Sequence, residues 1–331
     1  MRFTKTVAVA LAVLPMLVGV SAAAAAPPPP TDTGSPQIVG GDPAPVAYAG
    51  AGSLQLLDHD DPNWHTCGLT FLDEGYTETG DPASVAVTQG HCLSNPPPQS
   101  EQARMPAEVK ARFESLRAAA GDPNIDRTDP SIYHARFGST NRLQGGLVRH
   151  GTKIDVPPDW KWGYPDAEGR VWDIALIRLD GHLDGIRPAR IAAAQPWLPA
   201  LSIGWGTRNV DPTTWTSPAP ADLSQINIPL LAAKNCAPGG IGTGELCGGV
   251  PPTGGGACTG DSGSGLLQHQ GTTWSLMGTV SRGATPYCGA SPTIYNNISA
   301  FTAWIRKHVR QLLPGRPKAT THLAAATTPA S

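Results

Sequence analysis

The segment Gly256–Gly265, GACTGDSGSG, places an aspartate and a serine among four glycines. Glycine tolerates backbone angles that other residues avoid, and it lets another backbone or a ligand come close. A serine held in such a turn, Ser262, could be exposed for nucleophilic chemistry. The same residue types also dominate plain surface turns. Taken alone, the segment is better explained as a turn. Whether Ser262 is a nucleophile therefore depends on residues elsewhere in the chain.

Two other segments contain the partners that a nucleophilic serine needs. VTQGHC at 87–92 places His91 at the end of an expected strand, and WDIALIRL at 172–179 places Asp173 at the head of an apolar one. A histidine near neutral pH can take the serine proton, and a buried carboxylate can orient that histidine. Separately, each residue has an ordinary interpretation: a hydrogen-bonded core histidine, a strand cap and a turn residue. Together they favour a catalytic triad. The remaining histidines considered, which lack such a context, are predicted to lie at the surface: His59, His65, His134, His150 and His182.

The beginning of the chain predicts export. A basic start, an apolar run over 7–20 and small residues up to Ala26 are typical of a signal peptide over residues 1–26. The run contains Pro15 and is short for a membrane span. A proline-rich leader follows over 27–37. We therefore expect a secreted, extracellular protein in which disulfides can form.

Charge and cysteine usage exclude several classes of partner. The formal net charge is −2 and no basic block occurs, which argues against nucleic acid or a membrane surface as partner. An even number of cysteines in an exported chain suggests three disulfides, although six cysteines allow 15 pairings. Zinc is the alternative, but the chain has no Cys-x-x-Cys pair and no cluster of cysteines with histidines, so we expect no metal and no cofactor. The six are Cys67, Cys92, Cys236, Cys247, Cys258 and Cys288.

Short apolar segments between turns dominate the rest of the sequence. With 38 glycines and 34 prolines, this pattern predicts an all-β barrel or sandwich. Two helices interrupt it. The first spans 106–120, with an i, i+4 pair of Glu108 and Arg112, and the second spans 299–309 near the C-terminus. Residues 311–331 are rich in Thr, Ala and Pro and are predicted to be a disordered tail.

Seven short motifs resemble the trypsin/chymotrypsin-like serine proteases, and we interpret the resemblance as one to the secreted bacterial type. They are IVGG at 38–41, HC at 91–92, DIALIRL at 173–179, GWGT at 204–207, CTGDSGSGL at 258–266, SRG at 281–283 and PTIY at 292–295. The resemblance implies two six-stranded antiparallel β-barrels over 38–310, divided near 190–200, with a C-terminal helix. The first expected helix is then an insertion, and residues 27–37 are a propeptide.

The resemblance also implies roles for individual residues. His91, Asp173 and Ser262 would form the triad, the N–H groups of Gly260 and Ser262 would bind the oxyanion, and Ser281 would contact Asp173 and present the substrate backbone. Cleavage before Ile38 would free an α-amine that pairs with Asp261. Because Gln37 precedes that bond, an unidentified activating protease is expected. The implied disulfides are Cys67–Cys92, Cys236–Cys247 and Cys258–Cys288.

The expected specificity pocket is shallow and uncharged. Gly256 would lie at its floor, Ser281 and Gly283 along its wall, and Thr293 would block its bottom in part. Such a pocket fits small or medium apolar side chains. A preference for Phe or Tyr is the alternative if Thr293 turns aside.

Three residues and two long loops depart from the family pattern. Gln89 and Gly90 stand where two small residues usually precede the histidine, and we expect Gly90 to loosen the backbone there. Arg282 replaces a tryptophan, so it is predicted to make the pocket wall cationic or to extend its charged head into water. The loops at 73–82 and 94–130 are enlarged, and their acidic residues follow no recognisable calcium-loop spacing. We expect a monomeric serine endopeptidase that acts on proteins or peptides. The alternative is a protease-like fold kept as a binding module with weak or no catalysis.

Overall fold

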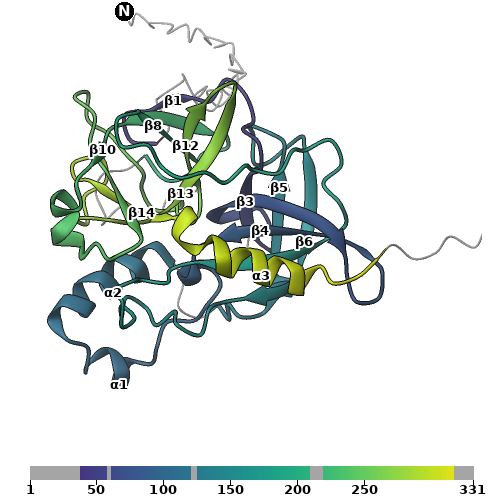
Figure 1. The fold of residues 1–331 in the computed structure, drawn as a ribbon, viewed down its shortest axis with the longest axis horizontal. Coiled ribbons are helices and arrows are strands. Elements are labelled where there is room, and N and C mark those ends of the chain that lie inside the picture. Colours follow the sequence, from purple (N-terminus) through teal and green to yellow (C-terminus); the bar gives the residue numbers. More distant parts are fainter. Residues whose placement is uncertain (1–37, 58–60, 121–124, 209–218, 317–331) are drawn as a thin grey trace, which may run out of the picture. The chain divides into compact units, whose positions relative to one another are not determined.

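The computed structural model describes residues 38–57, 61–120, 125–208 and 219–316 (Figure 1). The expected signal peptide and propeptide, His59, and the tail from residue 317 lie outside these ranges. None of the helices in the described part of the chain is both long and apolar enough to cross a membrane.

Six antiparallel strands close into a barrel in the N-terminal half. Their order around the barrel is β2-β3-β4-β7-β6-β5. Its interior is filled by apolar side chains such as Leu54, Phe71 and Ile177, all fully buried. Irregularities in the ladder at Leu54/Gln55 and Phe71/Asp73 increase the local twist, which helps a short sheet close on itself. The strands are β2 (Ala51–Leu56), β3 (Trp64–Tyr76), β4 (Pro82–Thr88), β5 (Tyr133–Phe137), β6 (Leu147–Asp155) and β7 (Ala175–Asp180).

The C-terminal half forms an eight-stranded antiparallel sheet in the order β1-β9-β8-β12-β13-β14-β11-β10. This differs from the second closed six-stranded barrel that we expected, because its edges are two strands of only two residues. Pro43 lies in one edge strand and Pro229 precedes the other, and proline has no N–H to continue a ladder. The strands are β1 (Asp42–Pro43), β8 (Ala200–Gly204), β9 (Ser224–Ile228), β10 (Leu230–Leu231), β11 (Glu245–Gly248), β12 (Gly265–Gln270), β13 (Thr273–Gly283) and β14 (Thr293–Asn297).

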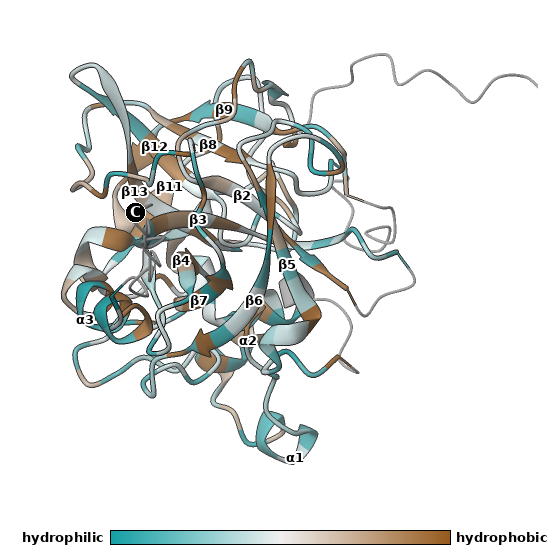
Figure 2. Cartoon of the chain, turned by 90° about the vertical axis from the view of Figure 1, so that its right-hand side faces the viewer, coloured by the Kyte–Doolittle hydropathy of each residue, from teal (hydrophilic) through white to brown (hydrophobic). Residues whose placement is uncertain are grey.

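One apolar cluster joins the two halves. It combines Val85 and Val87 of β4 with Ile203 of β8 and Leu267 of β12. Helix α3 (Thr302–Leu312) and the 3-10 turn η5 (Ile298–Phe301) add their apolar side to the same cluster, and brown and teal residues alternate around α3 in Figure 2. The connection between β7 and β8 spans 181–199.

The C-terminal helix runs further than the sequence indicates. It ends at Leu312, whose side chain is buried, and Gly315 N–H donates to Tyr76 O at 3.0 Å. The segment from 311 to 315, expected to be disordered, is therefore held against β3.

The insertion at 94–130 contains helices α1 (Gln99–Gln102) and α2 (Ala107–Ala120), which lie beneath the strands in Figure 1, and it ends where the 3-10 turn η2 (Pro130–Ile132) begins. Helix α2 buries Val109, Phe113 and Leu116, whose spacing of three and four residues places them on one face. Arg112 does not make the expected salt bridge with Glu108. Its Nε donates to Gly240 O at 2.7 Å instead, which ties the helix to the end of the 3-10 turn η4 (Ala233–Gly239).

Candidate active site

His91 and Asp173 are in direct contact where the two halves meet. His91 lies in the 3-10 turn η1 (Gly90–Cys92) that follows β4, and Asp173 lies just before β7, which pairs with β4. His91 Nδ1 is 2.9 Å from Asp173 Oδ2, and the backbone N–H of His91 donates to Oδ1 at 3.0 Å. Both side chains are fully buried. Since a carboxylate only accepts, Nδ1 carries a proton, and Nε2 is left as an acceptor whenever the imidazole is neutral.

The surroundings of Asp173 keep it ionised. Burial alone would raise the pKa of Asp173, but the charge and hydrogen bonds of His91 and the Ser281 hydroxyl together lower it below its ordinary value. Ser281 Oγ donates to Asp173 Oδ2 at 2.7 Å, and the amide of Asn296 donates to the Asp173 backbone carbonyl. A buried carboxylate held from these directions fixes the tautomer and the orientation of the imidazole.

The turn that carries Ser262 is attached to both halves of the molecule. Ser262 O accepts from Gly68 N–H of β3 at 2.7 Å, and Gly263 N–H donates to Val280 O of β13 at 2.9 Å. A Cβ on Gly263 would lie 2.2 Å from Gly68 O and 2.3 Å from Thr88 Oγ1, and its φ is +82°. Only glycine fits this close approach, which answers why one glycine follows Ser262.

A second set of glycines makes room for the carboxyl group of Asp261. Gly206 N–H donates to Asp261 Oδ1 at 2.7 Å, and Cys258 N–H donates to Oδ2 at 2.8 Å. A Cβ on Gly204 would lie 2.0 Å from that Oδ1. Burial raises the pKa of Asp261 to about 7, against the opposite effect of the two backbone donors. No cation pairs with Asp261 among the described residues.

Ile38 lies in the same region. Its side chain is fully buried and packs in one cluster with Ala257, and Gly256 N–H donates to Val39 O at 2.9 Å.

His65 is a site residue that the sequence analysis missed. It was expected at the surface, but it is buried in β3, because its Nε2 lies 2.8 Å from Gly260 O and its Nδ1 lies 2.8 Å from Ser53 Oγ. Burial and the charge of Arg142 lower the pKa of His65 to about 3, so the ring is neutral. A carbonyl only accepts, so Nε2–H donates to Gly260 and Nδ1 accepts from Ser53. The signal in the sequence is the position of His65 within the apolar strand before Cys67.

Of the other three described histidines expected at the surface, His150 is exposed and His182 is half-buried, but His134 is buried. His134 lies on β5, opposite His150 on β6.

The two unusual residues before His91 have defined packing roles. The Gln89 amide donates to the backbone carbonyls of Thr279 and Val280 on β13. Gly90 lies under the indole of Trp160, and a Cβ there would be 2.9 Å from two ring carbons. That Gly90 loosens this backbone stays a prediction, although its carbonyl accepts from Ser94 Oγ at 2.7 Å.

Arg282 neither charges the pocket wall nor reaches water. Its guanidinium forms a two-pronged ion pair with Glu245 at 2.6 and 2.9 Å, and both side chains are fully buried. It also donates to the carbonyls of Gly239 and Gly240, both at 3.0 Å. Both predictions for this residue were therefore wrong, because β11 and the end of η4 place four acceptor oxygens within its reach.

A cavity of about 480 Å³ opens beside Ser262. Ser281, Gly283 and Thr293, all predicted pocket residues, line it, together with Cys258 and Cys288. Gly256 lies next to Thr293: a Cβ added to Gly256 would be 3.6 Å from Thr293 Oγ1. Three residues of α2 also line the cavity, a contribution that the sequence did not indicate.

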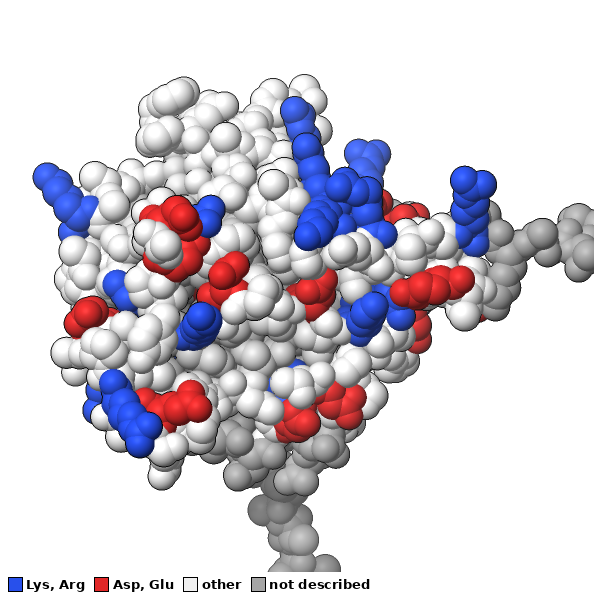
Figure 3. All heavy atoms as spheres, turned by 60° about the horizontal axis from the view of Figure 1, so that its bottom comes forward, with Lys and Arg blue, Asp and Glu red and all other residues white. Residues whose placement is uncertain are grey.

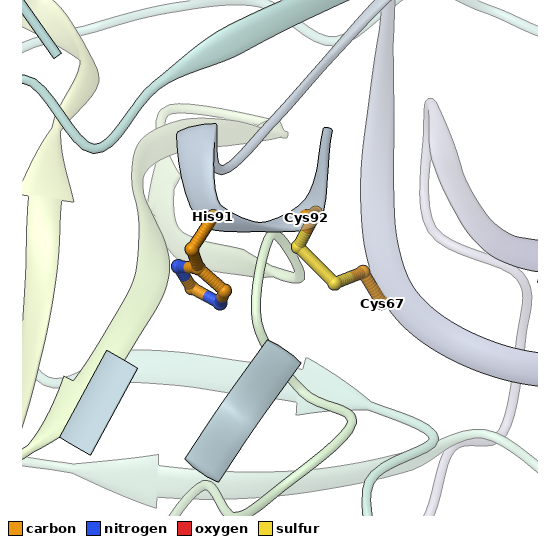
Figure 4. A group of neighbouring side chains, drawn as sticks. All are labelled: Cys67, His91 and Cys92. Carbon is orange, nitrogen blue, oxygen red and sulfur yellow. A yellow bond between two sulfur atoms is a disulfide. The ribbon is translucent and has the colours of Figure 1, made fainter. Parts of the chain in front are cut away.

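The cysteines form the three disulfides that the family resemblance implies. They are Cys67–Cys92, Cys236–Cys247 and Cys258–Cys288. Cys67, Cys92 and His91 lie close enough to suggest a metal site, but Figure 4 shows the two sulfurs bonded to each other. A disulfide has no thiolate to offer a metal. The bond instead fastens the turn of His91 to β3.

Comparisons with known proteins agree with this arrangement. The family model described as Trypsin matches residues 82–305. A chymotrypsin-like serine proteinase of Haliotis rufescens is 25% identical over 284 residues, covering 82% of this chain and 91% of that protein. Serine protease 28 of Mus musculus is 24% identical over 299 residues, covering 82% and 89%. Human kallikrein-7 is 34% identical over 159 residues, covering 45% and 59%.

The chain belongs to the trypsin family of serine proteases. These relatives are animal proteins, and they give no support to the expected bacterial type.

Proposed function

We propose that the protein is a secreted serine endopeptidase that uses His91, Asp173 and Ser262 as a catalytic triad. The observation that carries this proposal is the state of His91. Its Nδ1 faces the Asp173 carboxylate, while its Nε2 is buried without a hydrogen-bond partner in the described structure. An unpaired buried acceptor is costly, and such atoms are often kept for chemistry.

The proposed reaction passes through an acyl-enzyme. Ser262 Oγ attacks the peptide carbonyl carbon as His91 Nε2 takes its proton. The N–H groups of Gly260 and Ser262 bind the oxyanion. The tetrahedral intermediate collapses when His91 returns the proton to the leaving amine. A water molecule then attacks the acyl carbon as His91 Nε2 takes its proton. His91 returns that proton to Ser262 Oγ, and the carboxylic acid product leaves. His65 supports this role of Gly260, because its hydrogen bond to Gly260 O fixes the orientation of the backbone there.

A binding module without catalysis is the alternative, and labelling separates the two. A fluorophosphonate reagent should label the wild-type protein at Ser262 and leave Ser262→Ala unlabelled. Peptide hydrolysis should fall by about 10⁴-fold or more in Ser262→Ala, because His91 then has no hydroxyl to activate. Hydrolysis that persists in a clean Ser262→Ala preparation would contradict the triad. A wild-type protein that neither reacts with the reagent nor hydrolyses peptides would favour the binding module.

We further propose that the protein is made as a zymogen and activated by cleavage before Ile38. The burial of Ile38 beside Ala257, and a buried Asp261 with no described cation partner, support this. The family relationship supports export and protein or peptide substrates.

We expect cleavage after small or medium apolar residues. Apart from Glu114 on α2 and Arg282, whose charge Glu245 neutralises, the residues that line the cavity are uncharged, so burying an unpaired substrate cation there would be costly. The position of the Thr293 hydroxyl beside Gly256 supports a shallow floor. Matched substrates with Ala, Val, Leu, Phe or Arg before the cut should show a broad preference, since one methylene is worth only about 1–3 kcal/mol. Fastest cleavage after Arg would overturn this proposal, and fastest cleavage after Phe would show that Thr293 leaves the floor open.

A further inference from the structure

Helix α2 is built into the substrate cavity. Ala111, Glu114 and Ser115 line it, at positions i, i+3 and i+4 that share one side of a helix. The helix belongs to the enlarged loop at 94–130, so this wall is particular to the insertion. The same cavity reaches Ser262, so one continuous space runs from the proposed nucleophile to α2.

The position of α2 is fixed by contacts on its other side. Phe113 packs edge-to-face on Trp162, with ring centroids 5.9 Å apart, and both residues are buried. Arg112 donates to Gly240 O at 2.7 Å and to Gly163 O at 3.1 Å. A helix held this way presents its cavity side chains at defined places.

A peptide in this cavity would lie between α2 and the edge of β13. The segment 281–283 pairs with β14 on one side, and no described strand pairs with its other side. An extended peptide can add to such an edge by backbone hydrogen bonds. Ser115 Oγ already reaches across to Gly283 O at 3.5 Å. Residues upstream of the scissile bond would therefore pass beside Glu114 and Ser115.

Glu114 is the one carboxylate available to such a peptide among the residues that line the cavity. The other charged lining residue is Arg282, whose charge is neutralised by Glu245 in the buried pair. Glu114 has a weak partner in Arg117 at 3.4 Å, and both side chains are about half exposed, so that pair contributes little. Acidic and basic side chains are interspersed on the face shown in Figure 3, so an individual carboxylate, rather than a broad field, has to provide discrimination.

We propose that Glu114 selects substrates with a lysine or arginine upstream of the residue that enters the pocket. This inference rests on the proposed peptidase function and adds a second specificity element. The pocket floor at Thr293 accepts an apolar side chain, and α2 accepts a cationic one further along the peptide.

The test uses two sets of peptides that differ only in lysine or norleucine at the second, third or fourth residue before the cut, with leucine before the cut. The lysine/norleucine ratio of kcat/KM should exceed one at one of these positions. It should fall by about 1.5-fold to fivefold in Glu114→Gln, as expected for an exposed ion pair. Arg117→Gln should raise the ratio, because it frees Glu114. Glu108→Gln on the same helix is the matched control and should leave the ratio unchanged. Added salt should lower the ratio in the wild type.

Binding of the same peptides to Ser262→Ala separates the two proposals. If the lysine peptide binds more tightly and Glu114→Gln removes the difference, the Glu114 proposal holds even where the wild type hydrolyses nothing. In that case only the peptidase proposal fails. An equal ratio in the wild type and Glu114→Gln, in hydrolysis and in binding, would overturn the role of Glu114.

Discussion

At the scale of single residues, Asp261 connects the proposed activation to stability. Its carboxyl group is buried and receives two backbone N–H donors, but no described cation neutralises it. Burial raises the pKa of Asp261 to about 7, from an ordinary value near 4. At a pH between these two values, Asp261 therefore keeps its proton in the folded chain and loses it in the unfolded chain.

This difference predicts how pH acts on the uncut chain. Because the native state binds the extra proton, the free energy of unfolding should fall as pH rises from about 4 to about 7, by on the order of a few kcal/mol. After cleavage before Ile38, the α-amine should pair with Asp261, lower the pKa of its carboxyl group and remove most of this fall. Urea unfolding of the cut and uncut forms at pH 5 and pH 8 measures the effect.

Asp261→Asn in the uncut chain is the control, since the amide is similar in size and does not titrate. The difference between Asp261→Asn and the wild type should grow with pH in the uncut form. Equal pH dependence in the cut and uncut proteins would contradict the pairing. So would an active species that N-terminal sequencing finds to begin upstream of Ile38.

At the scale of elements, a buried ion pair holds β13, β11 and η4 together behind the cavity. Arg282 of β13 reaches Glu245 of β11 and the carbonyls of Gly239 and Gly240. Helix α2 joins the same point, because Arg112 also donates to Gly240 O. The wall of the proposed substrate cavity thus depends on one charged residue where the family usually has an aromatic ring.

Breaking this pair on one side should be strongly destabilising. Glu245→Gln or Arg282→Met leaves one buried charge without its partner, which should cost about 3–5 kcal/mol in the free energy of unfolding. The double variant, Arg282→Met with Glu245→Gln, should be more stable than either single variant, because neither charge remains. Denaturant unfolding of the four proteins completes the cycle. Strictly additive single effects would show that the pair is not coupled.

At the scale of the whole molecule, the proposed active site exists only because the two halves are held in register. The turn of His91 belongs to the first barrel, while the Ser262 turn is bonded to both halves. Gln89 reinforces the junction from behind, since its amide donates to Thr279 O and Val280 O and its carbonyl accepts from Thr279 Oγ1 at 3.2 Å. Val280 O also accepts from Gly263 N–H. One carbonyl therefore holds both Gln89, which precedes the His91 turn, and Gly263, which follows Ser262.

Gln89→Leu should therefore affect catalysis as well as stability. Losing these buried hydrogen bonds should lower the free energy of unfolding by about 1–3 kcal/mol. We expect kcat to fall while KM changes little, because the substrate cavity is left intact. Stopped-assay kinetics together with denaturant unfolding measure both effects.

Gln268→Leu is the matched control for Gln89→Leu. Gln268 is also buried and donates to two carbonyls, those of Gln195 and Leu198, at 2.9 and 3.0 Å. It should lose similar stability with kcat unchanged. An equal fall of kcat in both variants would show that Gln89 acts only through general stability.

The sequence by itself determined the family, the all-β architecture and both main helices. It could do so because these features depend on local patterns. Glycines beside Ser262 and Asp261 are required by close backbone contacts, and apolar periodicity sets the strands and helix faces. The implied cysteine pairs are also the pairs that the structure forms.

The tertiary structure decided how distant polar groups are paired. The burial of His65 depends on Gly260, which is 195 residues away, and Gln89 meets carbonyls 190 and 191 residues away. The charge of Arg282 is neutralised only because β11 brings Glu245 beside it. Helix α2 lines the cavity only because its contacts with Trp162 and Gly240 anchor it. Hydrogen bonds and ion pairs act over a few ångströms, and a sequence gives no distance between residues that the fold alone brings together.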